Sequence, residues 1–280
     1  MQCIFVSDIH GDSSRYESLM AIVKREQPDG VFLGGDLLPG GFGLTNDVEV
    51  FFENVLFSRI RELRKKGADT RFFVILGNDD PRSFESVFTK ASTDGLIQYV
   101  HDKTVLFGDL SVTGYGFVPP TPFQLKDWEK FDVSQYVDIG GVSPLEGVRS
   151  VEVSQDSVRF GTIADDLKQL ARGVEMDRAI FLFHSPPYNS LLDRAALDDK
   201  KIDHVAVDVH VGSIAIQRFV KKRQPLVTLH GHVHESVRLS GVWHEMFGRT
   251  HAMSAAYDGS ELAVVRFDTN DLDNASRELV

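Results

Sequence analysis

The chain has 280 residues but only one cysteine, Cys3. A single thiol cannot form an intrachain disulfide, so we expect a buried thiol in a reducing cytoplasm. No apolar run approaches the roughly 20 residues that a membrane-spanning helix needs. The first apolar stretch, residues 3–6, has no basic leader and no small-residue cleavage site, so a signal peptide is not predicted. These absences favour a cytoplasmic protein without a membrane partner.

Basic residues are also scarce relative to acidic ones. Lys and Arg number 30 against 41 Asp and Glu, which gives a formal net charge of -11 and a pI of about 5.3. Complexes with duplex DNA or anionic membranes rely on basic clusters, so we expect no stable nucleic-acid complex. A phosphorylated substrate is still compatible with this composition, because bound cations can attract phosphate locally.

Apolar residues make up 42% of the chain, which is enough for a large core. Short apolar runs alternate with segments of helical spacing, and this alternation predicts a parallel βαβαβ unit with right-handed crossovers. The predicted strands are residues 3–6, 31–33, 72–76, 179–183 and 226–229. One predicted helix begins after Asp12, and three others span about 47–66, 165–172 and 213–222. Antiparallel strands are expected over 237–267, followed by a frayed polar tail after Asp268.

Three stretches break this rhythm. Residues 117–160, rich in proline and glycine, predict an irregular insertion or cap within a single domain that spans 1–280. The aromatic residues and Lys126 of this cap either line a substrate entrance or pack as a flap on the sheet. Residues 186–211 are also irregular, and the glycine-rich loop at 39–43 is either a mobile rim or an ordinary loop.

Asp, Asn and His side chains follow five predicted strands at the same topological place. The segments are Asp8-Ile9-His10, Gly34-Gly35-Asp36, Gly77-Asn78-Asp79-Asp80, His184-Ser185-Pro186-Pro187 and His230-Gly231-His232-Val233-His234. One Asp at a strand end is more often a turn former or a helix cap. Because the carboxyl ends of parallel strands meet at one edge of a sheet, the five segments together predict a metal site.

This order of motifs resembles the calcineurin-like metallophosphoesterases, whose pattern reads Asp-x-His, Gly-Asp, Gly-Asn-His-Asp/Glu, His and Gly-His-x-His. The match runs from Asp8 to His234. Residues 114–132 and 184–193 resemble, more loosely, a bacterial branch of predicted phosphoesterases. The resemblance implies an α/β fold, namely a four-layer αββα sandwich of two mixed β-sheets flanked by helices.

The resemblance assigns two sets of metal ligands by matching position. Asp8, His10, Asp36 and His234 would hold one ion, and Asp36, Asn78, His184 and His232 the other. A carboxylate can bridge two cations, and imidazoles suit Mn, Fe, Zn or Ni, of which we expect Mn²⁺. Two divalent ions supply a bridging hydroxide that attacks a phosphate ester. The expected protein is therefore a hydrolase acting on a phosphorylated small molecule or a nucleotide-type substrate.

Asp79 stands where the family has a His that contacts the phosphate and assists the leaving group, so Asp79 and Asp80 are the candidate catalytic residues. An ionised Asp79 beside two cations cannot donate a proton, and it repels a dianion more than a monoanion. We therefore expect phosphodiesters to be better substrates than monoesters. Asp80 is expected to orient neighbouring groups.

Two other functions stay open. A catalytically reduced metal-binding scaffold of the same fold is favoured by Asp79 and disfavoured by the complete ligand set. A nuclease would need a basic track, and the only obvious basic cluster, residues 221–223, ends a predicted helix, where cations favour the helix dipole. His204, His210 and His230 are either proton donors at the rim or ordinary structural residues. The sequence indicates neither the natural substrate nor an oligomeric state.

Overall fold

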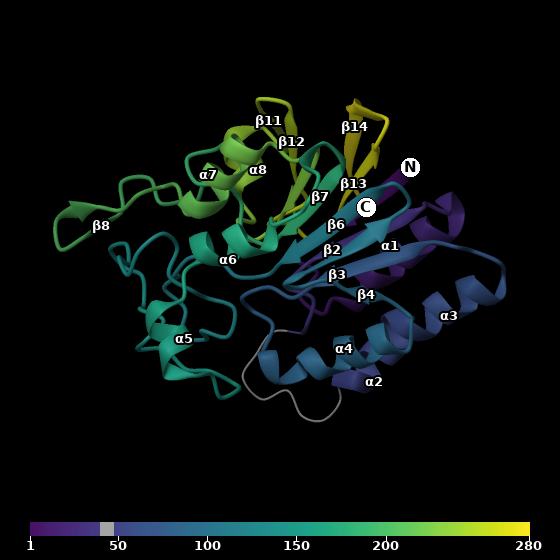
Figure 1. The fold of residues 1–280 in the computed structure, drawn as a ribbon, viewed down its shortest axis with the longest axis horizontal. Coiled ribbons are helices and arrows are strands. Elements are labelled where there is room, and N and C mark those ends of the chain that lie inside the picture. The colour runs from purple at the N-terminus through teal and green to yellow at the C-terminus, as the bar shows by residue number, and fades with distance from the viewer. Residues whose placement is uncertain (40–47) are drawn as a thin grey trace.

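The computed structural model describes residues 1–39 and 48–280 as two six-stranded β-sheets packed face to face, with helices on both outer sides (Figure 1). This is the predicted four-layer αββα sandwich. Most of the glycine-rich loop predicted at 39–43, and the predicted helix start at Asp47, lie outside the described residues.

The first sheet has the strand order β14-β13-β1-β2-β3-β4. Its strands are β1 (Gln2–Val6), β2 (Gly30–Gly34), β3 (Arg71–Ile75), β4 (Gln98–Tyr99), β13 (Ala263–Asp268) and β14 (Asp271–Leu279). Strands β1 to β4 pair in parallel, as the βαβαβ prediction requires, whereas β13 pairs antiparallel with both β1 and β14. The sheet is therefore mixed.

The second sheet has the order β11-β12-β10-β7-β6-β5. Its strands are β5 (Lys103–Phe107), β6 (Leu110–Tyr115), β7 (Ala179–Phe183), β10 (Val227–His230), β11 (His244–Phe247) and β12 (Thr250–Ser254). The four inner strands β12, β10, β7 and β6 are parallel, and each outer strand is antiparallel to its neighbour.

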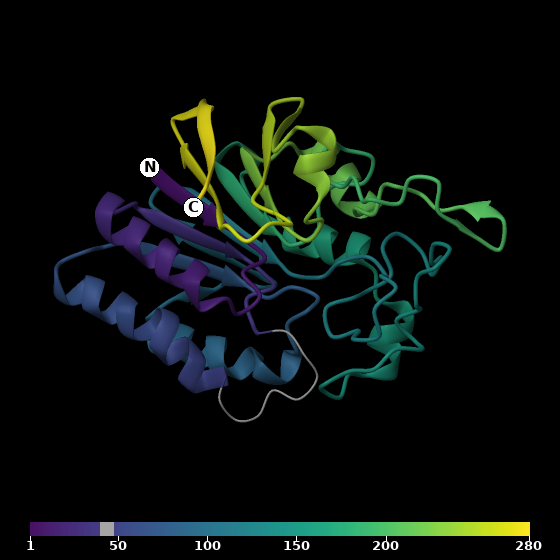
Figure 2. The same cartoon turned by 180° about the vertical axis from the view of Figure 1, so that it is seen from behind.

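Helices cover the two outer faces of the sandwich (Figures 1 and 2). On the first sheet lie α1 (Ser13–Glu26), α2 (Val48–Phe52), a π-helical stretch (Glu53–Phe57), α3 (Ser58–Lys65), a 3-10 turn (Arg82–Phe84) and α4 (Glu85–Thr93). The remaining helical elements are α5 (Gln155–Phe160), α6 (Ile163–Leu170), a 3-10 turn (Met176–Arg178), α7 (Ile214–Arg223) and α8 (Ser236–Ser240). Of these, α6 and α7 pack on the outer face of the second sheet.

The central strands are apolar throughout because both of their faces are buried. In β1, Phe5 points into the core between the two sheets, whereas Ile4 and Val6 point toward the helices. Strand β3 alternates in the same way, with Phe73 between the sheets and Val74 under the helices. Successive side chains of a strand point to opposite faces, so a strand buried on both sides cannot carry the polar residues of a half-exposed strand.

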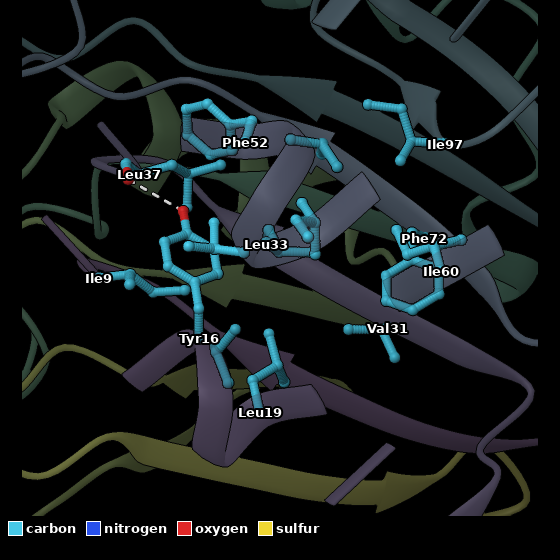
Figure 3. Packing of buried hydrophobic residues seen from close by; sticks show 14 of the residues in the cluster. Ile9, Tyr16, Leu19, Val31, Leu33, Leu37, Phe52, Ile60, Phe72 and Ile97 are labelled. Carbon is cyan, nitrogen blue, oxygen red and sulfur yellow. Dashed lines mark hydrogen bonds between the residues drawn. The ribbon is translucent and has the colours of Figure 1, made fainter. Parts of the chain in front are cut away.

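The core under the helices reaches the loops that carry the site residues (Figure 3). Tyr16 of α1 is fully buried, and its hydroxyl donates a hydrogen bond of 2.9 Å to the carbonyl of Leu37 in the loop after β2. Asp12, after which a helix was predicted, caps α1 by accepting from the N–H groups of Ser14 and Arg15. Packing and capping together fix the helix directly beside the loops after β1 and β2.

The predicted cap, residues 117–160, is irregular apart from isolated bridges and α5. Trp128 is fully buried, and its indole N–H donates to the carbonyl of Asp80 at 2.7 Å. Lys126 is also fully buried and pairs with Glu129, so Lys126 belongs to a packed flap and does not line an entrance. The division of the chain into one domain with this insertion stays a prediction.

The expectation of antiparallel strands over 237–267 is confirmed in part, and that of a frayed tail was wrong. Strand β12 pairs antiparallel with β11, and β13 with β1 and β14, but β12 also pairs in parallel with β10, and α8 lies where the first of these strands was predicted. The polar tail forms β14, which completes a hairpin with β13 and buries Leu272. A strand at the edge of a sheet can face water on one side, so its polar residues do not prevent pairing.

In the 186–211 stretch, β8 (Lys201–Ile202) and β9 (Val205–Ala206) form a small hairpin that projects from the body (Figures 1 and 2).

Candidate metal centre

The predicted site residues follow strands β1, β2, β3, β7 and β10, which end at one edge of the sandwich. Asp8 and His10 follow β1, Asp36 follows β2, Asn78, Asp79 and Asp80 follow β3, His184 follows β7, and His232 and His234 follow β10. Backbone hydrogen bonds hold the loops together: Asp8 donates to the carbonyl of Gly35 at 3.0 Å, and Gly231 donates to that of His184 at 2.9 Å. The five segments form one layer of loops.

Four of these residues adopt a left-handed backbone conformation. The φ angles are 56° at Asp8, 51° at His10, 53° at Asp36 and 74° at His232. Such a conformation costs a non-glycine residue about 1–3 kcal/mol and persists only where the surrounding structure imposes it. Strained residues of this kind are concentrated in functional sites, so the backbone independently marks this edge as a site.

Two glycines are required by the close approach of site side chains. A Cβ atom on Gly77 would lie 2.3 Å from an oxygen of Asp36 and 2.6 Å from the ring of His184. A Cβ atom on Gly231 would lie 2.7 Å from the carboxylate of Asp8. The glycine of each motif therefore leaves room for a ligand that belongs to a different strand.

Asp8, His10, Asp36 and His234 form one tight group. Each offers one ligand atom, and these atoms all lie within 4.8 Å of one another. The Nε2 atoms of His10 and His234 are 3.1 Å apart, and His234 Nε2 lies 3.4 Å from the carboxylate of Asp8. Two imidazoles and two carboxylates are a suitable donor set for a divalent first-row metal.

A second group meets at the carboxylate of Asp36. His184 Nε2 lies 3.3 Å from Asp36 Oδ2 and 3.1 Å from the side-chain oxygen of Asn78. His184 Nδ1 lies 2.7 Å from the carbonyl of Gly34, and donation to that carbonyl leaves Nε2 free to bind a metal. The ring of His232 lies 5.2 Å from the ring of His184. Asp36 therefore stands between the two groups.

The two buried carboxylates, those of Asp8 and Asp36, need positive charge close by. Among the described residues, Asp8 and Asp36 have ion-pair partners only in histidines. Burial acts to raise the pKa of Asp8, but the hydrogen bond and charge of His234 outweigh it and hold that pKa below its usual range. Burial likewise acts to raise the pKa of Asp36, but the charge and hydrogen bond of His184 and the charge of His10 together lower it.

The pKa values of two site histidines are raised by the same interactions that lower those of the carboxylates. Burial disfavours the charged imidazolium of His184, but Asp36 raises its pKa to about 10, and Asp8 similarly raises the pKa of His234 to about 9. Without a metal, the protonated imidazoles supply the positive charge that balances the buried carboxylates. Bound metal ions would supply that charge instead. His232 differs: burial and the charge of His184 lower its pKa to about 3, which keeps its imidazole neutral and able to bind a metal.

Asp80 joins two of the loops and does not face the reaction side. Its carboxylate is fully buried and accepts from the N–H groups of Leu37 at 2.9 Å, Leu38 at 2.8 Å and Gly77 at 2.9 Å. These contacts fix the backbone directly after Asp36 and directly before Asn78. The orienting role expected of Asp80 stays a prediction with which this geometry agrees.

Asp79 lies at the mouth of the site, with 46% of its side chain exposed. Its N–H donates to Asp36 Oδ1 at 2.9 Å, and its carboxylate accepts from the amide of Asn78 at 3.0 Å and lies 3.8 Å from His10 Nδ1. Among protein groups alone, burial and the charge of Asp36 raise the pKa of Asp79. Asp79 therefore contacts both ligand groups from the open side.

The three other candidate histidines, His204, His210 and His230, are not part of these groups. Both nitrogens of His230 have buried partners, the carbonyl of Ser185 at 2.9 Å and the hydroxyl of Thr228 at 2.8 Å. His210 pairs with Asp193 at 2.7 Å, and His204 is exposed between β8 and β9.

The sequence analysis did not predict the contact of Gly34 with His184. The contact is made by a backbone carbonyl, which every residue has, so residue type does not indicate it.

A family model named calcineurin-like phosphoesterase matches residues 1–236. The chain therefore belongs to the calcineurin-like phosphoesterase family, whose members are hydrolases of phosphate esters that use divalent metals. This agrees with the candidate metal group of Asp8, His10, Asp36 and His234. A sequence search of curated proteins found no match.

Solved structures share the fold at low sequence identity. One is the protein TT1561 of Thermus thermophilus, with a TM-score of 0.56 and 16% identity over 99% of this chain and 98% of that one. Another is a dimetal phosphatase from Danio rerio, with a TM-score of 0.54 and 12% identity over 100% of this chain and 95% of that one. Across residues 1–39 and 48–280, no helix is long and apolar enough to span a membrane.

Proposed function

We propose that the protein is a dinuclear metal-dependent phosphodiesterase. The observation that carries this proposal is the position of Asp36, whose Oδ2 lies 3.3 Å from His184 Nε2 and 4.0 Å from His10 Nε2. A single carboxylate between two imidazole-containing groups is suited to bridging two cations. His10 and His234, with Asp8, would hold one ion; Asn78, His184 and His232 would hold the other.

When bound, two divalent ions supply Lewis acidity and a hydroxide nucleophile at neutral pH. Mn²⁺ is the metal that we propose, with Fe, Zn or Ni as alternatives that the same ligands accept. The residues of the chain fix the ligand positions, and the carboxylates of Asp8 and Asp36 are buried. No side-chain nucleophile is needed.

Asp79 supports a preference for diesters. Its carboxylate is the exposed anion beside His10, where a phosphate would approach. Two bound cations would favour its ionised form, in opposition to the burial that raises its pKa among protein groups alone. One additional unit of substrate charge about 5 Å away costs about 1–3 kcal/mol at the dielectric of a protein surface. A dianionic monoester should therefore react about 5- to 100-fold less efficiently than a diester, and Asp79 should not act as a proton donor.

The deciding experiment is hydrolysis of bis-p-nitrophenyl phosphate and p-nitrophenyl phosphate by metal-stripped protein, before and after Mn²⁺ is added. We expect Mn²⁺ to restore diester hydrolysis, Asn78→Ala to abolish it, and Asn54→Ala, an exposed control, to retain it. No hydrolysis by protein that holds two ions would instead support the scaffold alternative. A clear monoester preference would contradict the role of Asp79.

The nuclease alternative receives no support from the position of the basic cluster. Residues 221–223 form the last turn of α7. Helix α7 begins after the loops at the site edge and runs back to the start of β10, so this turn lies toward the opposite edge of the sheet. Binding of labelled oligonucleotides at several salt concentrations tests this point, and we expect no salt-dependent binding in the micromolar range.

A further inference from the structure

Two arginines outside the ligand set connect one short loop to both sides of the candidate metal centre. Arg15 lies at the start of α1, after Asp8 and His10, and Arg238 lies in α8, after His234. The loop is residues 258–260, which we call the bracing loop. It follows β12, whose end is level with that of β10, so the bracing loop leaves the sheet at the edge that carries the site.

Arg15 uses its whole guanidinium group to hold backbone carbonyls. Nη1 donates to the carbonyl of Asp8 at 2.9 Å, Nη2 to that of Gly259 at 2.5 Å, and Nε to that of Ser260 at 3.3 Å. Asp8 is one of the residues with a strained backbone, at φ 56°. The contact at its carbonyl therefore helps to impose the conformation that points its carboxylate toward His234.

The position of Arg15 has an electrostatic cost that its contacts explain. Arg15 occupies the first turn of α1, where the positive end of the helix dipole disfavours a cation, and the only carboxylate close by there is that of the capping residue Asp12. A guanidinium group is a planar fork with several fixed donors, whereas a lysine ammonium is a point charge. The spread of fixed donors suits the fork to three carbonyls on two separate segments, whereas the three donors of an ammonium leave a single nitrogen.

Arg238 ties the bracing loop from the other side. Its Nε donates to the carboxylate of Asp258 at 2.7 Å. The loop after β1 and the loop after β10 are thus joined through a third segment, in addition to the contacts between their own ligands. Arg238 and residues 258–260 lie beyond residue 236, where the family match ends. The brace is therefore not part of what the family model describes.

We propose that Arg15, Arg238 and the bracing loop form a positioning device for one metal position, the one built from Asp8, His10 and His234. This inference rests on the proposed function, because it concerns the same metal centre. The other position depends on His184, Asn78 and His232. The segments of His184 and Asn78 are held by the carbonyl of Gly34 and by Asp80, and only the N–H of His232 contacts the braced part, at the carboxylate of Asp8. Loss of the brace should therefore weaken the first ion more than the second.

The test is the binding of Mn²⁺ to metal-stripped protein, measured by calorimetry and by electron paramagnetic resonance. Removal of a group that orients a metal ligand typically weakens metal binding by about 10- to 100-fold. We expect Arg15→Gln to weaken one Mn²⁺ by that factor and the other markedly less, with a smaller effect on the same ion in Arg238→Gln. Arg25→Gln is the matched control, since Arg25 lies on the same helix, exposed, and pairs with Glu26.

Three results would overturn the inference. Equal weakening of both ions, or a lower melting temperature with unchanged Mn²⁺ binding, would mean that Arg15 acts only on the fold. Full recovery of binding in Arg15→Lys would mean that charge alone, and not the three carbonyl contacts, matters. If Arg15→Gln does not fold, Arg238→Gln carries the same test. A wild-type protein that binds a single ion would contradict the dinuclear proposal but not the brace, whose effect is then measured on that ion.

Discussion

The Nε2 atoms of His10 and His234 lie 3.1 Å apart, although the two residues are separated by 224 positions in the chain. His10 follows the first strand of one sheet, and His234 follows an inner strand of the other. A metal ion held by both would join the two sheets at their shared edge. Metal binding should therefore stabilise the whole fold and not only a loop.

Mn²⁺ should raise the melting temperature of metal-stripped protein. An ion at 100 times its dissociation constant adds about 2.7 kcal/mol per site to the free energy of unfolding, which corresponds to about 5–10 °C for a chain of this size. Differential scanning calorimetry with and without a chelator measures this shift. His234→Ala should reduce it and His204→Ala should not; an undiminished shift in His234→Ala would place the ion elsewhere.

Asp80→Ala should destabilise the protein strongly. Three buried N–H groups would lose their acceptor, and the expected loss in the free energy of unfolding is about 3–5 kcal/mol. Urea unfolding measures it, with Asp109→Ala as control, because the exposed pair of Asp109 with Arg178 is worth less than about 1 kcal/mol. A loss in Asp80→Ala no larger than in the control would remove Asp80 from its orienting role.

Asp79→His should shift the substrate preference toward monoesters. The change removes the exposed anion and introduces the side chain that the family motif carries at this position. We expect the ratio of kcat/KM for p-nitrophenyl phosphate to that for bis-p-nitrophenyl phosphate to rise at least fivefold, and Asp79→Asn to produce part of that rise. An unchanged ratio in both variants would show that the charge of Asp79 does not select the substrate.

Acid should destabilise the metal-stripped protein through three histidines: His232, whose pKa is lowered to about 3 when no metal is bound, and two buried ones that are not proposed ligands. Burial lowers the pKa of His101 to about 3 and that of His230 to about 4, below the unfolded value of about 6.5. The unfolded chain thus binds more protons, so the stability from each residue is fully present above pH 6.5. That stability falls by about 1.4 kcal/mol per pH unit as the pH drops toward the folded pKa.

Urea unfolding at pH 7, 6 and 5 measures this dependence, and His230→Gln should reduce the slope below pH 6.5. His184 and His234 do not contribute in this window, because their raised pKa values keep them protonated in both states below pH 6.5. An equal slope in His230→Gln would mean that His230 is protonated in the folded protein.

The strands and helices of the first half could be predicted because their signals are local. A fully apolar run such as β3 and a capping residue such as Asp12 are recognised from neighbouring residues alone. The C-terminal elements were less predictable. Whether β12 pairs parallel or antiparallel, and whether β14 forms at all, depends on partners that are distant in the sequence. No local pattern encodes such pairings.

The sequence by itself determined which side chains are available as ligands and that each follows a strand, since parallel strands end at a common edge. Only the tertiary structure decided which ligands meet, because the distance between His10 and His234 depends on how two sheets pack. It also decided the contacts of Arg15, whose carbonyl partners could belong to any residue type. The chemistry of each side chain follows from its residue type alone, whereas the distances between side chains are a property of the folded chain.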